Sequence, residues 1–84
     1  MKERISLCAL SPDECAVVRE LRGNVGMKRR FFDLGLTPDT RVECVGKSPS
    51  GDPCAYLVRG AVIAIRAEDC RDIWVERIGG EQWD

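Results

Sequence analysis

The sequence contains no histidine, and this absence bears directly on the chemistry the chain can perform. Histidine is the usual general base of enzymes at neutral pH and the commonest neutral metal ligand. A serine nucleophile would have no imidazole to activate it, and residues 23–26 lack the Lys-Ser/Thr ending of a phosphate-binding loop. A chain of 84 residues also has little room for both a core and a deep pocket. The composition therefore predicts a protein that is not an enzyme and holds no cofactor.

An excess of charge of one sign is also missing. The chain has 13 basic and 14 acidic residues, so its net charge is −1. Proteins that bind phosphate backbones rely on a surplus of lysine and arginine, so we expect no nucleic-acid partner. The only concentrated basic run is Lys28-Arg29-Arg30. Such a run is either a solvated helix face or a contact for an acidic partner.

Long hydrophobic runs are absent as well. The longest, residues 61–65, falls far short of the roughly 20 residues that span a bilayer. The N-terminus has no apolar segment typical of a signal peptide, so we expect a cytoplasmic protein. We predict one domain over residues 1–78 and a flexible C-terminal tail over residues 79–84.

The five cysteines are widely spaced, and no two of them form a C-x-x-C pair. The sequence therefore lacks the usual signature of a zinc or redox site, and an odd count argues against a closed set of disulfides. Cysteine behaves as a small hydrophobic residue, so we predict core positions and no metal site. A metal bound by cysteines distant in sequence, or across a dimer, remains the alternative. The cysteines are Cys8, Cys15, Cys44, Cys54 and Cys70.

Short alternating or valine-rich segments predict about five strands, over residues 15–21, 41–45, 54–58, 61–66 and 73–77. In the first of these, Leu21 is expected on the same face as Cys15. Residues 59–60 are typical of a tight hairpin turn, and residues 67–72 of a single helical turn. Short strands separated by frequent turns predict a mainly β protein folded as a small, strongly bent barrel.

One short helix is predicted in the middle of the chain. Asn24 is suited to cap its first turn. Met27, Phe31 and Leu34 follow the helical period and form an apolar stripe, which Phe32 widens. We therefore expect Met27 and both phenylalanines in the core. Gly35 stands where a left-handed residue ends a helix, and Leu36 would then pack back on Phe31.

Three segments resemble, in order and spacing, the FeoA family. They are residues 28–40 (KRRFFDLGLTPDT), 48–53 (SPSGDP) and 62–75 (VIAIRAEDCRDIWV). The resemblance implies an SH3-like β-barrel with an accessory role in bacterial ferrous-iron uptake. It also implies a partner, the FeoB membrane permease with its cytoplasmic GTPase domain. The same domain type closes some iron- or manganese-responsive repressors, where it is an interaction module.

Two departures from the family pattern concern turns. Asp13 and Asp39 stand where the family often has glycine, which a type II turn favours at this position. We expect the local backbone to adapt towards a type I turn while the barrel persists. In addition, Phe31 and Phe32 replace smaller aliphatic residues, so any exposed part of that stripe is a candidate docking surface.

The predicted partner-binding residues flank the helix. Lys28, Arg29 and Arg30 would supply charge, Leu34 and Leu36 apolar contact, and Gly35 the local geometry. The predicted function is a non-enzymatic accessory module that binds FeoB. Two alternatives stay open: a metal-binding regulator that uses thiolates, and an interaction domain related to the repressor domains. Association of the chain with itself is also left open.

Overall fold

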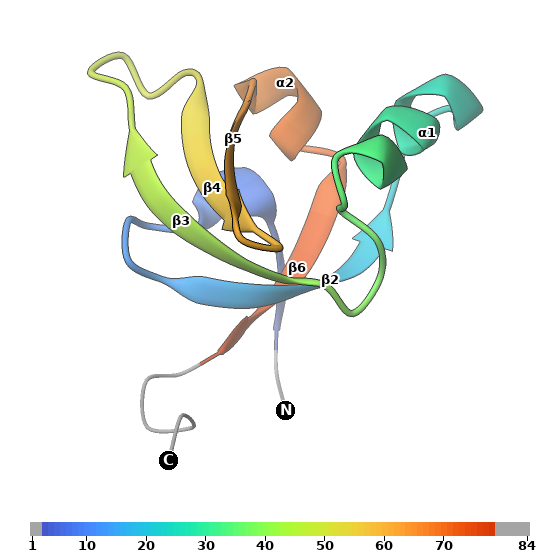
Figure 1. The fold of residues 1–84 in the computed structure, drawn as a ribbon, viewed down its shortest axis with the longest axis horizontal. Helices are drawn as coiled ribbons and strands as arrows, with labels where there is room; N and C mark the ends of the chain where they lie inside the picture. Colours follow the sequence, from blue (N-terminus) through green and yellow to red (C-terminus); the bar gives the residue numbers. More distant parts are fainter. Residues whose placement is uncertain (1–2, 79–84) are drawn as a thin grey trace.

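Six strands form one antiparallel sheet in the computed structural model, which describes residues 3–78 (Figure 1). In sheet order, β1 (Arg4–Ser6) is followed by β6 (Ile73–Ile78), β2 (Cys15–Leu21), β3 (Arg41–Lys47), β4 (Cys54–Val58) and β5 (Ala61–Ile65). The helices are the 3₁₀ helix η1 (Leu7–Ala9), α1 (Val25–Asp33) and α2 (Ala67–Cys70). The predicted mainly β, SH3-like fold with a mid-chain helix and a helical turn before the last strand is confirmed. The sequence did not predict β1 and η1, and the predicted flexible tail lies outside the described residues.

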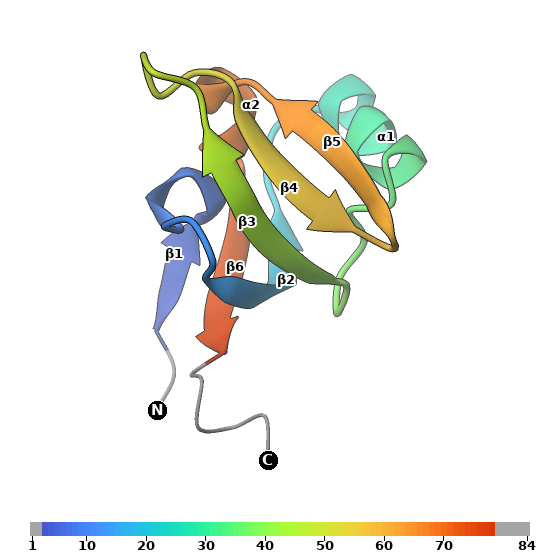
Figure 2. The ribbon, with the colours of Figure 1, turned by 60° about the vertical axis from the view of Figure 1, so that its left-hand side comes forward.

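The sheet is strongly bent, and the core lies inside the bend. Figure 2 shows β3, β4 and β5 side by side, with β6 and β2 behind them. Inward side chains alternate along the strands, as a half-buried sheet requires. The largest fully buried side chains come from every part of the chain: Tyr56, Phe31, Leu7, Leu10, Leu36 and Ile73.

The two Pro-Asp turns close the β2–β3 pair at its two ends. The Asp13 N–H donates to the Cys44 carbonyl at 2.7 Å, and the Asp39 N–H donates to the Val18 carbonyl at 2.7 Å. Both aspartates have a φ of 72°, so the expected change to a type I turn is wrong. Each turn keeps its left-handed residue because that residue's N–H is bonded into the sheet, and aspartate tolerates this conformation better than most residues.

A β-bulge changes the register of β2. The pairing of β2 with β6 shifts between Val18 and Glu20. Beyond this shift Leu21 joins Ala16 and Val18 on the buried face. The prediction that Leu21 shares a face with Cys15 is therefore wrong, because it assumed uninterrupted alternation.

Candidate partner-binding site

The start of α1 is fixed by its cap. Asn24 has an extended backbone, and its side-chain oxygen accepts a hydrogen bond from the Met27 N–H at 2.9 Å. This bond satisfies one of the backbone donors that the first helical turn leaves free. The predicted N-cap is confirmed, and it fixes where α1 begins.

The end of α1 is a Schellman motif. The Leu36 N–H donates to the Phe31 carbonyl at 2.8 Å, and the Gly35 N–H donates to the Phe32 carbonyl at 2.9 Å. Gly35 has a φ of 90°, which glycine adopts without strain. The predicted helix ending is confirmed. Leu36 is fully buried, however. The prediction that its side chain contributes apolar contact to a binding surface is therefore wrong.

Arg59, in the turn between β4 and β5, holds the segment that follows α1. Its Nε donates to the Gly35 carbonyl at 3.2 Å, and its terminal nitrogen donates to the Thr37 and Thr40 hydroxyls, each at 3.0 Å. A Cβ on Gly35 would lie 3.1 Å from the Arg59 Cδ, so the two residues are closely fitted. Sequence reasoning missed Arg59, because nothing in the sequence indicates that this hairpin lies against the end of α1.

The outer face of α1, formed by Val25, Lys28, Arg29 and Phe32, is an exposed surface that combines apolar and basic side chains. Val25 is 76% exposed and Phe32 is 53% exposed. Together with Asp33 these residues line a shallow hollow of about 410 Å³. The prediction that Phe32 belongs to the core is wrong, because one helical step carries it away from the buried stripe.

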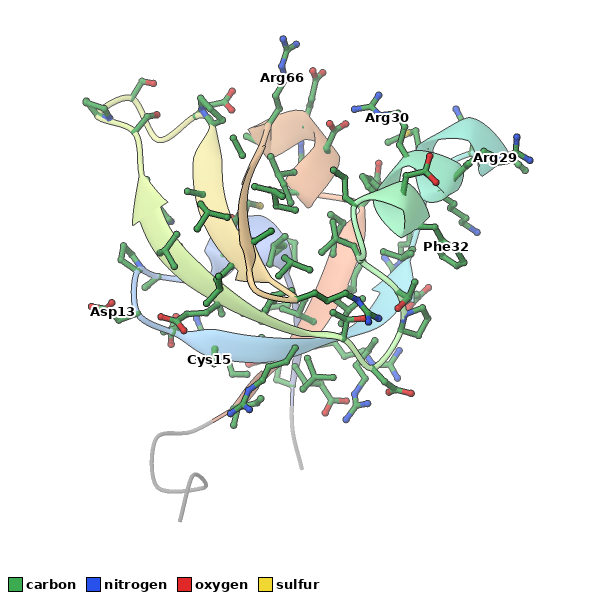
Figure 3. The ribbon with its side chains drawn as sticks, in the orientation of Figure 1. Asp13, Cys15, Arg29, Arg30, Phe32 and Arg66 are labelled. Atoms are coloured by element: carbon green, nitrogen blue, oxygen red, sulfur yellow. The ribbon has the colours of Figure 1, made fainter. Side chains whose placement is uncertain are left out.

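The remaining predicted site residues have different surroundings. Arg30 donates to an Asp69 carboxylate oxygen of α2 at 3.0 Å, so its charge already has a partner. Figure 3 shows Arg29 and Arg30 pointing in different directions from α1. Leu34 is 42% exposed just past the helix, and Gly35 is half-buried. The structure therefore brings Lys28, Arg29 and Leu34 to the surface and adds Val25 and Phe32 to them.

A second hollow, of about 600 Å³, lies over the outer side of β3 and is lined by Cys15, Asp39, Leu57 and Arg59 among others. Two of its charged groups are engaged within the domain. Asp39 accepts a bond from Arg19 at 2.6 Å, and Arg59 is bonded to the segment after α1. These two groups are therefore less available to a partner than Lys28 and Arg29 on the outer face of α1.

Three of the cysteines, Cys44, Cys54 and Cys70, are buried, whereas Cys8 and Cys15 are half-buried. The predicted core role is confirmed for the buried three. Burial raises the pKa of Cys70 to about 12, so this thiol stays neutral at physiological pH. Within residues 3–78, no three histidine, cysteine, aspartate or glutamate side chains gather in a way that could hold a metal ion.

The comparison with family models identifies one family. The FeoA domain matches residues 5–77. No sequence among the curated proteins matches the chain. Within residues 3–78, no helix is long and apolar enough to cross a membrane.

Solved structures share the fold over nearly the whole chain. A FeoA-like protein from Clostridium acetobutylicum is 28% identical, with a TM-score of 0.86 over 94% of this chain and 92% of its own. The FeoA protein from Chlorobium tepidum is 25% identical, with a TM-score of 0.83 over 90% of this chain and 72% of its own.

The same fold occurs in a regulator. A manganese-dependent transcriptional repressor has a TM-score of 0.83 but only 16% identity, over 93% of this chain and 44% of its own. That likeness concerns the fold alone. The family match spans most of the chain, from β1 into β6. The chain therefore belongs to the FeoA domain family and is a non-catalytic accessory protein of ferrous iron transport.

Proposed function

We propose that the chain acts in the cytoplasm by binding the GTPase region of a FeoB-type permease through the outer face of α1. One observation carries this proposal: two large apolar side chains, Val25 and Phe32, are exposed beside two cations, Lys28 and Arg29. Neither cation forms an ion pair with any of residues 3–78.

The composition of this face suits a protein partner. Aromatic and arginine side chains dominate the binding energy of protein interfaces, especially where an aromatic ring fills a pocket. Phe32 is the natural anchor of such a contact, and Arg29 lies one turn before it on the same side of α1. We infer that the partner offers an apolar pocket bordered by carboxylates. Leu34 extends the apolar contact beyond the end of the helix.

The face is also held in place before any partner binds. The Asn24 cap fixes one end of α1, and the bonds from Arg59 fix the segment after the other end. The Arg30–Asp69 bond ties α1 to α2. A surface that is already ordered loses less conformational entropy on binding, which favours affinity. The neighbouring residues thus support the outer face without belonging to it.

The alternative of a thiolate-based metal regulator gains no support from the arrangement of the cysteines. Cys44, Cys54 and Cys70 are buried, and within the described part of the chain no metal-binding group forms around any cysteine. The alternative of a repressor-like interaction domain has the shared fold in its favour but no residue-level observation. Binding of a FeoB-type permease through the outer face of α1 therefore remains the proposal.

The test is binding to the purified cytoplasmic region of FeoB, measured by calorimetry and by co-purification. We expect Phe32→Ala and Arg29→Glu each to weaken binding by about tenfold or more, since loss of an interface anchor costs at least that much. Lys47→Glu, which makes the same charge reversal at the end of β3, is the matched control and should bind like the unchanged protein. Unchanged binding by both α1 variants, or equal weakening by the control, would contradict the proposal.

A further inference from the structure

The free edge of β5 is an unprotected strand edge. Among residues 3–78, β5 pairs only with β4, and no helix makes an extensive contact with it. Val62 is 64% exposed, and Ala61 and Ala64 are also exposed. Proteins usually protect such edges with charged residues, proline or a bulge. The strand Ala61–Ile65 has none of these, so its edge is open to another strand.

The backbone groups on this edge follow from the hairpin. Residues 59–60 have φ values of 51° and 85°, which make a two-residue turn of the type I′ kind. In such a hairpin the flanking pair, Val58 and Ala61, exchanges backbone hydrogen bonds across the turn. Alternate residues of β5 from Ala61 onwards therefore bond to β4. The N–H and C=O groups of Val62 and Ala64 point outward, and none of them has a partner within residues 3–78.

We propose that two copies of this chain associate through β5, as antiparallel strands related by a two-fold axis at Ile63. In this register each Val62 exchanges both of its outward backbone hydrogen bonds with Ala64 of the second copy. All the outward groups of the strand are then satisfied, and the two sheets become one continuous sheet. Because the contact is isologous, it closes as a dimer and leaves neither copy with an open β5 edge.

The side chains fit this register. Val62 of one copy lies beside the small side chain of Ala64 of the other, on the same face of the joined sheet. Leu57 continues this apolar face on β4, where it is the cross-strand neighbour of Val62. A strand without charges also brings no like-charge pair to the centre of the contact. The pairing therefore buries apolar surface together with the backbone bonds.

The ends of the paired strands are compatible as well. The two-fold register places Arg66 opposite Gly60 of the second copy. Gly60 carries no side chain, and a Cβ built there would meet nothing within 4 Å, so there is room for the arginine. Arg66 also has Glu68 within 3.7 Å, which offsets part of its charge.

A second copy is the occupant that this edge fits best, because the chain itself supplies a strand of matching register and apolarity. This inference goes beyond the proposed function. It concerns a different edge of the fold from the outer face of α1, and it does not depend on the identity of the permease. A strand supplied by another protein is a competing occupant that the experiments distinguish.

The first experiment measures backbone amide hydrogen exchange at high and low protein concentration. We expect the amides of Val62 and Ala64 to be protected at high concentration and to exchange rapidly on dilution. Ala61 and Ile63, which bond to β4, are the internal controls and should be protected at both. Rapid exchange of Val62 and Ala64 at every concentration would overturn the proposal. Protection that arises only when the permease region is added would also overturn it, in favour of a partner strand.

The second experiment uses matched variants in sedimentation equilibrium. The unchanged chain should reach twice the monomer mass of 9.4 kDa as its concentration rises. Val62→Lys should remain monomeric, because it places two lysines beside the central pairs. Val25→Lys makes the same change at another exposed valine and should dimerise normally. Circular dichroism confirms that both variants are folded. A monomeric unchanged chain, or dimerisation of Val62→Lys, would contradict the proposed contact.

Discussion

Four consecutive residues of α1, Arg29 to Phe32, divide between two surroundings. Arg30 bonds to Asp69 and Phe31 is only 2% exposed, whereas Arg29 has no ion-pair partner among the described residues and Phe32 is 53% exposed (Figure 3). One arginine and one phenylalanine therefore face the domain, and one of each faces outward. Successive residues on a helix differ by about 100° in direction, so position on the helix decides which surroundings each one meets.

This division separates two tasks within one turn of helix. Arg30 and Phe31 attach α1 to the rest of the domain, while Arg29 and Phe32 remain available to a partner. A single substitution should therefore change mainly the stability of the domain or mainly the binding of a partner. The residues of a docking surface and the residues that hold it in place can then be studied separately.

The largest expected effect is on the stability of the inner face. Phe31→Ala should lower the free energy of unfolding by about 3–5 kcal/mol, because it leaves a cavity in the core and removes buried apolar surface. Phe31 belongs to the same buried cluster as Leu36, so part of the packing at the end of the helix is lost as well. Urea denaturation measured by circular dichroism gives the free energy.

Phe32→Ala is the matched control for this experiment. Its side chain is mostly exposed, so we expect the free energy of unfolding to change by no more than about 0.5 kcal/mol. If the two variants were destabilised equally, the two phenylalanines would not occupy different surroundings.

Much of this arrangement is readable from the sequence where local rules decide the structure. The Asn24 cap and the ending at Gly35 follow from the backbone needs of any helix, and both predictions are confirmed. The hairpin turn at residues 59–60 follows in the same way from turn chemistry. Short strands and frequent turns also predict a small, bent β-barrel from the residues alone. The family resemblance then adds the SH3-like fold type and the accessory role.

The misplaced residues depend on contacts between distant parts of the chain. The sequence predicts Phe32 in the core from its place beside the apolar stripe, but it does not show which side of α1 the rest of the domain covers, and Phe32 is 53% exposed. Asp13 and Asp39 were expected to change their turns, but bonds from the sheet hold each of them in the left-handed region. The sequence does not predict the role of Arg59, because the carbonyl to which it donates, that of Gly35, is distant in sequence.

An intermediate effect is expected where α1 ends. Gly35→Ala should lower the free energy of unfolding by about 1–2 kcal/mol, since alanine is strained in the left-handed region. The new Cβ would also lie 3.1 Å from the Arg59 Cδ, so Arg59 must shift and its bond to the Gly35 carbonyl weakens. Thermal and urea denaturation measure the change.

Gly26→Ala makes the same substitution inside α1 and serves as its control. Gly26 does not have a positive φ, and its new Cβ would meet only the Asn24 side-chain oxygen, at 3.4 Å. Alanine favours the helix over glycine, so the free energy of unfolding should rise by about 0.5 kcal/mol. A gain in stability from Gly35→Ala would show that the Schellman ending and the Arg59 contact do not fix the helix.

The smallest effect separates the two arginines. Arg30→Ala should lower the free energy of unfolding by about 0.2–1 kcal/mol, as is usual for an ion pair near the surface, and the loss should shrink as salt is added. Arg29 has no ion pair within residues 3–78, so Arg29→Ala removes the same charge and its stability should match that of the unchanged protein. Binding to the permease region should show the reverse order, with Arg29→Ala the weaker binder. Equal stability losses, or a larger binding loss for Arg30→Ala, would mean that the charge of the helix as a whole matters and not the direction of each side chain.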